Sequence, residues 1–470
     1  MMAISRSRKS PNIPPNARMS LPNEQMNAQP AHVHVGLRAR IFSAGSWILL
    51  GFVAMQVLRF GTNLILTRLL FPEAFGLMMI VFSINMGISL LSDLGIGAGI
   101  VVHAAGSEDG YLNTAWTIQV VRGLLIGLAL FACAHPLALA FSNLQVEPLL
   151  RIVALVPVIS GFTSTKVALA DRTLDPKRRV SIDLGMQIFS AVVTATLALV
   201  LHSTAALAWG SVVSTLFTVV VQHKVLQGSA NRFHWDRSQA REILSFGQIS
   251  FLSSGMLFIS AEGSRLFSAT LVDTRMLGLI SLATGLSLMP WQAIQTLSQR
   301  VLMPAYAEVV RSGDKARLRR AVLKARLMQI VPCWVINVLM IVGAHLIFRT
   351  LYDSRYAQAA LFLQIQCVGM LVAIVTFSYN GLLVGMRRQG LNLVLQTIQN
   401  VLLWGGIYVG YRLGGPVGLV IGTAASNWIY YPFAFVMYRR LGLSSGLLDA
   451  AVIGASGVVA ALLWVMTTHV

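Results

Sequence analysis

Charge is scarce in this sequence. Only 11% of its 470 residues are Asp, Glu, Lys or Arg, whereas 56% are hydrophobic. A soluble globular domain usually carries about 25% charged residues, because its surface must be solvated by water. The scarcity excludes an ordinary soluble domain. Together with a mean hydropathy of +0.70, the apolar runs that recur from residue 41 onward indicate a chain that lies in a lipid bilayer.

Acidic residues and cysteines are also few. There are 17 Asp and Glu against 36 Lys and Arg, which gives a formal net charge of +19. In a soluble protein this excess would suggest nucleic acid. Here the basic residues cluster between apolar runs, which is typical of membrane proteins, so no nucleic-acid partner is expected. Cys133, Cys333 and Cys367 lack metal-ligand spacing, and we interpret them as small core hydrophobes, with no metal or cofactor.

The apolar runs are about twice the length of a transmembrane strand, and they match the roughly 20 residues with which a helix crosses a bilayer core. The sequence therefore predicts an all-α polytopic membrane protein with 12–13 transmembrane helices. The expected spans are residues 44–68, 76–101, 113–134, 148–170, 181–202, 205–224, 244–271, 276–300, 325–348, 357–384, 391–411, 416–437 and 445–467.

The basic residues also indicate an orientation. Residues 1–40 are polar, rich in Pro, Asn, Ser and Arg, and are predicted to be a disordered tail. If this tail is cytoplasmic, the cytoplasmic side holds 24 Lys and Arg, the opposite side holds five, and seven lie within spans. Because cytoplasmic loops carry an excess of Lys and Arg, this bias predicts a cytoplasmic N-terminus.

The chain repeats itself at an offset of 202 residues. Residues 61–80 read GTNLILTRLLFPEAFGLMMI, and residues 263–282 read GSRLFSATLVDTRMLGLISL. Both segments cover the outer end of the first hairpin in their half, which predicts two lobes related by a pseudo-twofold axis along the membrane normal. The expected parts are a tail (1–40), a first six-helix lobe (41–225), a basic cytoplasmic linker (226–243), a second six-helix lobe (244–440) and an extra helix (441–470).

Several segments resemble one family when taken together. The first hairpin, NLILTRLLFPEAFGLMMIVFSINMGISLLSDLGIGAGIV (63–101), is similar to the opening of bacterial oligosaccharide flippases of the multidrug/oligosaccharidyl-lipid/polysaccharide exporter superfamily. The segments LSFGQISFLSSGMLFISAEGSRLF (244–267) and NGLLVGMRRQGLNLVLQ (380–396) also fit, as does the LG-x(11)-P-x(13)-P run from Leu277 to Pro304. Each motif is loose, and their order and spacing carry the resemblance.

This resemblance implies a V-shaped exporter fold in the bacterial inner membrane. It also implies movement of an undecaprenyl-pyrophosphate-linked oligosaccharide from the cytoplasmic to the outer leaflet by alternating access. Membrane lipids, a polysaccharide polymerase and its co-polymerase are the implied partners. The related peptidoglycan-precursor flippases carry an Arg-Asp pair where this chain has Thr62 and Asn63, so the sequence departs from that branch.

Three arginines inside spans are candidate cavity residues: Arg59, Arg122 and Arg265. A charge in a span is costly unless it faces water or a partner, and a guanidinium can bind a pyrophosphate in bidentate fashion. The repeat places Asn63 at the position of Arg265, so Asn63 joins the candidate substrate-binding residues. The alternative for each arginine is a structural ion pair or snorkelling toward the interface.

Two acidic residues are candidates for ion pairing or coupling. Glu262 is spaced i, i+3 from Arg265, so the two can neutralise each other, and Glu262 is also a candidate proton carrier. Asp93 is predicted to lie near the inner end of its span, where it caps a helix or pairs with Arg122. Lys166 is expected to snorkel to the interface.

Two other classes of function remain open. A drug/cation antiporter of the same superfamily would favour acidic residues in the cavity, whereas basic residues dominate these spans. A membrane glycosyltransferase or polymerase would need a catalytic constellation, and the sequence has no paired-carboxylate metal motif and no His/Cys cluster. We therefore expect a transporter rather than an enzyme, with no catalytic residues.

Overall fold

A computed structural model describes residues 33–92, 95–102, 106–173, 176–297, 315–379, 389–441 and 446–468. Over these ranges the chain is helical and has no strand, as the sequence predicts. The chain divides into two compact units, residues 1–44 and 45–470, and all the packing described below lies in the second. Helix α1 begins at Val33, so residues 33–40 of the expected tail are helical.

The first half of the chain contains ten helices within the described ranges. They are α1 (Val33–Leu69), α2 (Pro72–Leu91), α3 (Ile96–Val102), α4 (Asp109–Ala132), α5 (Ala134–Ala140), α6 (Val146–Val153), α7 (Leu155–Gly161), α8 (Lys166–Thr173), α9 (Pro176–Leu201) and α10 (Ala205–Val225).

The second half follows a segment of irregular backbone, residues 226–236. Its described elements are α11 (Arg237–Phe258), the π-helical turn η1 (Ile259–Gly263), α12 (Ser264–Ala269), α13 (Thr274–Leu297), α15 (Lys315–Leu351), the short 3₁₀ turn η3 (Ser354–Tyr356), α16 (Ala359–Phe377), α18 (Gln389–Arg440) and α19 (Gly446–Thr468).

Among the described residues, ten helices are long and apolar enough to cross a membrane. One of them, α18, covers two expected spans, 391–411 and 416–437. Its backbone is not helical at Gly414 and Gly415, so it consists of two helical stretches joined at these glycines. The expected spans 148–170 and 244–271 are instead built from helices with interruptions. Between α6 and α7 the cause is Pro157, which has no N–H to donate to the carbonyl four residues earlier.

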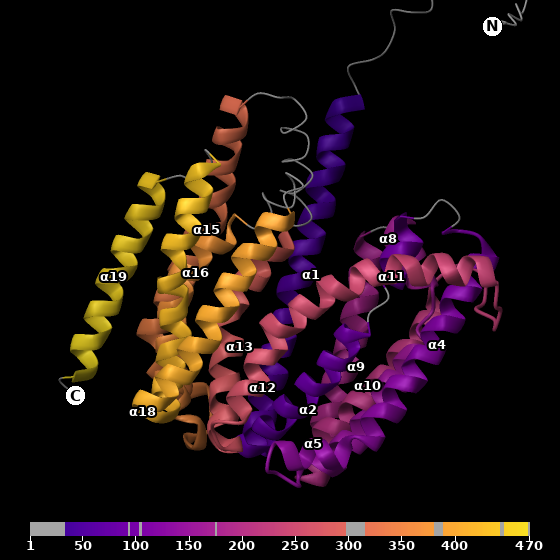
Figure 1. The fold of residues 1–470 in the computed structure, drawn as a ribbon, viewed down its shortest axis with the longest axis horizontal. Helices are drawn as coiled ribbons and strands as arrows, with labels where there is room; N and C mark the ends of the chain where they lie inside the picture. The colour runs from indigo at the N-terminus through magenta and orange to yellow at the C-terminus, as the bar shows by residue number, and fades with distance from the viewer. Residues whose placement is uncertain are drawn as a thin grey trace, which may run out of the picture. The chain divides into compact units, whose positions relative to one another are not determined.

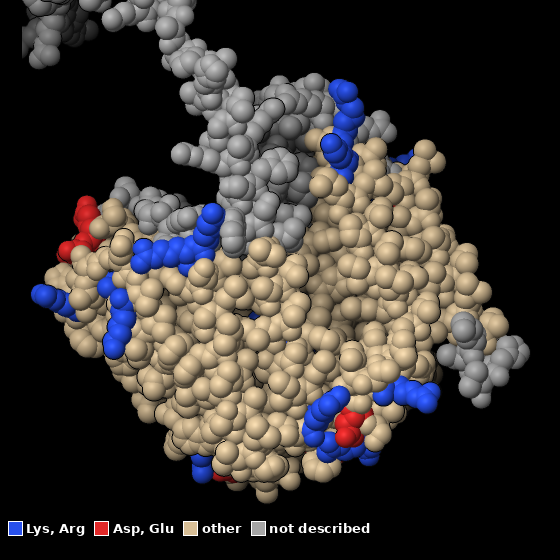
Figure 2. Space-filling model, turned by 180° about the vertical axis from the view of Figure 1, so that it is seen from behind, with Lys and Arg blue, Asp and Glu red and all other residues tan. Residues whose placement is uncertain are grey.

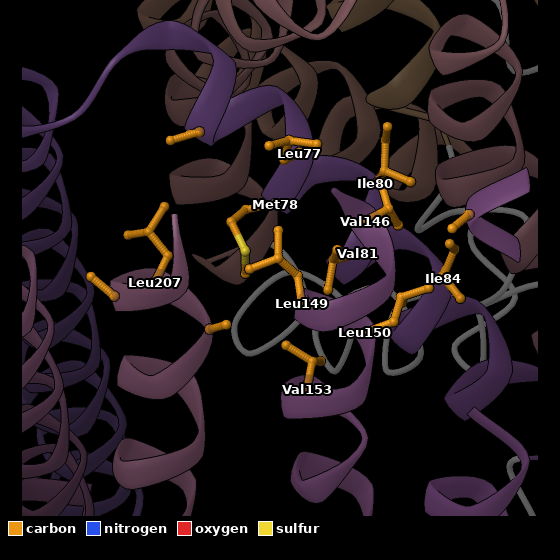
Figure 3. Packing of buried hydrophobic residues seen from close by; sticks show 14 of the residues in the cluster. Leu77, Met78, Ile80, Val81, Ile84, Val146, Leu149, Leu150, Val153 and Leu207 are labelled. Carbon is orange, nitrogen blue, oxygen red and sulfur yellow. The ribbon is translucent and has the colours of Figure 1, made fainter. Parts of the chain in front are cut away.

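The core of the first half is centred on α2. Figure 3 shows its side chains interleaved with those of α6 and with Leu207 of α10. Because α2 is apolar on all sides, it is stable only where other helices surround it. The labelled α2 residues are Leu77, Met78, Ile80, Val81 and Ile84, and those of α6 are Val146, Leu149, Leu150 and Val153.

In the second half, α16 takes the central place. It packs against α13, α15, α18 and α19, and most of its residues are buried. In Figure 1 the orange and yellow helices of this half gather together, apart from the purple helices of the first half. On the face drawn in Figure 2, Lys, Arg, Asp and Glu lie toward opposite margins, with a broad uncharged area between them. This is the distribution that a bilayer requires.

The two halves meet where α2 crosses α13, at glycines related by the repeat. A Cβ atom on Gly76 would overlap the carbonyl oxygen of Thr274 and lie 3.1 Å from the backbone nitrogen of Gly278. Reciprocally, a Cβ on Gly278 would overlap the Pro72 carbonyl oxygen and lie 3.1 Å from the Gly76 nitrogen. Gly76 and Gly278 are 202 residues apart, as are Pro72 and Thr274. The pseudo-twofold axis therefore passes through this crossing.

Two sequence-based expectations are wrong. Cys133 is exposed, because it caps the end of α4, whereas Cys333 and Cys367 are buried as expected. Lys166 does not snorkel. It is only 8% exposed, and its Nζ donates to the carbonyl oxygen of His223, 3.2 Å away, in the last turn of α10. The C-terminal end of a helix offers unpaired carbonyls, and these satisfy the ammonium group inside the protein.

Candidate functional site

A carboxylate joins the two halves at the π-helical turn η1. Glu262 is 7% exposed. Its Oε2 accepts a hydrogen bond of 2.7 Å from the Ser83 hydroxyl on α2, and its Oε1 accepts one of 2.9 Å from Nη1 of Arg265. A π-helical turn carries one extra residue and often occurs at functional sites. Here the turn carries Glu262, which forms an ion pair with Arg265 in its own half and accepts a hydrogen bond from the buried Ser83 hydroxyl in the other half.

Arg265 remains partly accessible in this arrangement. Its side chain is 43% exposed, whereas the Glu262 side chain is 9% exposed. The carboxylate therefore neutralises part of the arginine charge and leaves other guanidinium N–H groups toward the accessible side. A guanidinium has five N–H donors, so it can hold a carboxylate and a second acceptor at once.

Arg122 is tied to the end of α2. Its Nη2 donates to the Ser89 carbonyl oxygen at 2.6 Å, and its Nε and Nη2 lie 3.3 and 3.1 Å from the Ser92 hydroxyl. A cation at a helix C-terminus is favourable, because the last carbonyls carry partial negative charge. Asp93, the expected partner, lies outside the described residues.

Arg59 and Asn63 lie one turn apart on α1, so their side chains share a face. Arg59 is exposed and has no hydrogen-bond or ion-pair partner among the described residues. The Asn63 side-chain oxygen is buried and likewise unpartnered there. Arg59 precedes the end of α1 at Leu69 by ten residues, or about 15 Å of helix, which is half of a bilayer core.

The surroundings of α1 indicate what Arg59 faces. Phe60 and Leu64 pack against the core of the second half, whereas Leu66 and Leu70 belong to the core of the first half. Helix α1 thus runs between the halves. An unpaired arginine in hydrocarbon is very costly, so the guanidinium of Arg59 is expected to face water or a partner.

The described contacts do not join Arg59, Arg122 and Arg265 to one another. The structure pairs Arg265 with Glu262, holds Arg122 against α2, and leaves Arg59 without a partner in the described part of the chain. The three arginines therefore differ in how many guanidinium N–H groups they have left for a ligand. Their positions along the spans do not reveal this difference.

An apolar hollow of roughly 270 Å³ lies beside η1. The Trp404 ring stacks on Phe267, with centroids 5.1 Å apart. None of the described residues that line this hollow is charged, so they offer no group to hold a pyrophosphate. Its lining residues are Phe141, Phe258, Ile259, Gly263, Leu266, Phe267, Thr270 and Trp404.

A buried polar cluster escaped the sequence analysis. Arg326 on α15 and Asp449 on α19 are both fully buried and form an ion pair of 2.7 Å. Arg326 also donates to the Tyr379 hydroxyl at 2.6 Å and to the Ser378 hydroxyl at 2.9 Å, and the Tyr379 hydroxyl lies 3.1 Å from Asp449. The sequence does contain a signal for this cluster, because it places two opposite charges within apolar spans. The cluster fastens α19 to the second half.

Comparisons with known proteins agree with this architecture. Residues 65–361 match a family described as polysaccharide biosynthesis protein. The lipopolysaccharide biosynthesis protein WzxC of Escherichia coli (strain K12) is 22% identical over 396 residues, which cover 83% of this chain and 78% of that protein. The succinoglycan biosynthesis transport protein ExoT of Rhizobium meliloti (strain 1021) is 22% identical over 270 residues, 57% of this chain and 54% of ExoT.

Solved structures share the fold at low identity. An inward-facing multidrug resistance MATE family transporter of the MOP superfamily superposes with a TM-score of 0.66 at 16% identity, covering 84% of this chain and 95% of that one. A MOP superfamily transporter from Pyrococcus furiosus gives 0.57 at 14% identity, with 87% and 96% covered. The expected two-lobe exporter fold is confirmed.

Proposed function

The chain belongs to the polysaccharide biosynthesis protein family, and from this premise we propose that it is a flippase for an undecaprenyl-pyrophosphate-linked oligosaccharide. In this proposal it sits in the bacterial inner membrane with its N-terminus in the cytoplasm. It moves the pyrophosphate and sugars to the outer leaflet for polysaccharide assembly, where a polymerase and its co-polymerase use them. It carries out no covalent chemistry.

The observation that carries the proposal is the unpartnered Arg59 on the helix that runs between the halves. The polyprenyl tail can stay in lipid, but the pyrophosphate must cross about 30 Å of hydrocarbon. An anion there needs a buried cation and water. We assign Arg59 as the first contact at mid-bilayer, with the Asn63 amide one turn away as a hydrogen-bond donor.

The other two arginines take lesser parts in this proposal. Arg265 is accessible but shares its charge with Glu262, so it suits a weaker, transient contact. Arg122 is half-buried and already donates to two α2 oxygens, so its primary role is to hold the end of α2. Glu262, bonded to both halves, is the group whose protonation would alter their contact, and it is our candidate for ion coupling.

Alternating access is the mechanism that this proposal requires. Helix α13 meets α2 at Gly278, whereas Gly285, seven residues later on the same face, is exposed, and a Cβ atom added there would have nothing within 4 Å. Helices α2 and α13 therefore touch at the crossing and diverge away from it, whereas α11 stays in contact with α2 and α4 of the first half. If α2 and α13 separated at the crossing, the substrate would be released on that side of the membrane. The bias in Lys and Arg predicts that this is the outer side.

The test is complementation of a strain that lacks the gene. We expect Arg59→Gln, at normal expression, to abolish polysaccharide export and to accumulate the lipid-linked precursor, whereas Arg59→Lys restores part of the export. Arg412→Gln, at an exposed arginine outside the inter-lobe contacts, is the matched control and should export normally. Full export by Arg59→Gln would refute the assignment.

One observation favours a second candidate function. Glu262 is a buried carboxylate at the junction of the halves, and such a group suits a cationic substrate. A drug/cation antiporter would lose drug resistance in Glu262→Gln and would not need Arg59. Measuring drug susceptibility in the same strains separates the two candidates.

A further inference from the structure

The segment between α10 and α11, residues 226–236, is fastened to the first half. Three of its alternate backbone N–H groups donate to side chains of α4: Arg232 to the Asn113 oxygen at 2.9 Å, His234 to the Thr117 hydroxyl at 3.1 Å, and Asp236 to the Thr114 hydroxyl at 3.3 Å. We call this segment the strap. It is an ordered element rather than a loose connection between the lobes.

A second set of bonds holds the middle of the strap. The Asn231 amide nitrogen donates to the Thr165 hydroxyl at 2.6 Å, and its oxygen accepts from the Ser164 hydroxyl at 2.7 Å. Both hydroxyl residues are buried. Because the backbone and Asn231 are fixed in this way, the strap presents Arg232, Phe233 and Trp235 outward in a defined arrangement.

Those outward side chains are aromatic and basic. Phe233 is 67% exposed and Trp235 is 58% exposed, although Phe233 also touches the Trp116 ring at a centroid distance of 4.9 Å. Arg232 on the strap and Arg237, the first residue of α11, are exposed, and no partner of either guanidinium is found among the described residues. Exposing two large aromatic rings to water is unfavourable, and here a fixed backbone holds both rings at the surface beside unpaired guanidinium groups.

The position of the strap explains this composition. It follows the last turn of α10 and precedes α11, so it lies at the end of membrane-spanning helices, and Figure 1 shows α11 beginning beside α4 at the margin of the helices. Trp and Arg concentrate at this level of a bilayer. Anionic headgroups attract basic residues there, whereas zwitterionic headgroups do so far less.

We propose that the strap binds anionic phospholipid headgroups, with Arg232 and Arg237 contacting phosphates and with Phe233 and Trp235 inserted beside the acyl chains. The site is distinct from the inter-lobe residues and does not rest on the proposed transport function. It would hold the first half, to which the strap is bonded, at a fixed depth in the membrane.

The test uses the full-length protein in nanodiscs of phosphatidylcholine with or without phosphatidylglycerol. Retention of phosphatidylglycerol is measured by native mass spectrometry. Because each basic residue near an anionic surface contributes roughly five-fold in affinity, Arg232→Gln/Arg237→Gln should lower retention by an order of magnitude or more. The matched control, Arg439→Gln/Arg440→Gln, removes two exposed charges at the end of α18 and should retain the lipid.

Insertion of the aromatic residues is measured separately. Lipids brominated near the headgroup should quench the fluorescence component that is lost in Trp235→Phe, and aqueous iodide should not. Quenching by iodide alone would place Trp235 in water, would point to a soluble protein partner, and would overturn the proposal. Equal loss of lipid in the control pair would also overturn it, since the effect would then be one of total charge.

Discussion

A methyl group at the α2–α13 crossing should open the contact between the halves. In Gly76→Ala the new Cβ would overlap the Thr274 carbonyl oxygen, and in Gly278→Ala it would overlap that of Pro72. Uncrowded carbon atoms keep about 3.5–4.0 Å from their neighbours. Each obstacle is the backbone carbonyl of the first residue of a helix, so it cannot rotate away as a side chain could. The helices must separate by more than about 1 Å.

The size of the effect follows from this geometry. Forcing an extra methyl into close packing costs about 1–3 kcal/mol. If the strain is relieved by separation of the helices, the ratio of closed to open states falls by roughly 5-fold to more than 100-fold. The two substitutions should not add, because one separation of the helices relieves both overlaps, and contacting sites are generally coupled.

The assay is thiol labelling in a background without native cysteines. Leu277 on α13 is fully buried and belongs to the core cluster of the first half, so Leu277→Cys should react slowly with an impermeant maleimide. We expect labelling to rise at least five-fold in Gly76→Ala and in Gly278→Ala. Gly61→Ala and Gly285→Ala are matched controls, since each is helical with open space around a Cβ, and labelling should stay unchanged. Equal labelling in all four variants would refute the reasoning.

Three further predictions concern single charges. Asp449→Asn leaves Arg326 buried without its counter-ion, so the unfolding free energy in detergent should fall by about 3–5 kcal/mol, and less for Arg326→Met/Asp449→Leu. Glu262→Gln frees the Arg265 charge, so binding of a polyprenyl pyrophosphate, measured by calorimetry, should tighten by roughly two- to five-fold, and weaker binding would contradict this role. Hydrogen bonds from the Ser238 hydroxyl and nearby backbone lower the pKa of Asp236, so its stabilisation of the first turn of α11 is present above the usual aspartate pKa of about 3.9 and is lost as pH falls through the lowered value. The protection of backbone amides there against hydrogen exchange, relative to the intrinsic rate at each pH, should fall only below about pH 4, and Asp236→Asn should remove this pH dependence.

The helices themselves were accessible from the sequence, because a membrane span must be apolar over its whole length. Interruptions were less accessible. Pro157 lies within the expected span 148–170, and proline is tolerated in many membrane helices where neighbours satisfy the freed carbonyl. Similarly, nothing in the run ISAEG signals that residues 259–263 form a π-helical turn. Such a turn depends on tertiary contacts, here the Ser83 hydroxyl that reaches Glu262.

Pairing between distant charges was the largest omission. Arg326 lies one residue inside an expected span and looks able to reach the interface, whereas the structure buries it completely with Asp449, 123 residues later. Lys166 presents the same problem, because its partner is a backbone carbonyl and no sequence pattern marks it. The position of a charge along a span gives its depth in the bilayer. It does not tell whether the charge faces a neighbouring helix, the water-filled interior or a terminal carbonyl.

The repeat carries more information than the topology for which we used it. A residue on a twofold axis faces its own symmetry mate. The two equivalent residues must therefore share the space between their helices. Where two helical backbones cross on such an axis, only glycine fits, and it must occupy both positions. Gly76 and Gly278 meet that condition, because a Cβ atom added to either would lie 3.1 Å from the backbone nitrogen of the other. A small residue recurring in register within an internal repeat is therefore a sequence signal for the axis itself, and here it locates the contact on which the closed state depends.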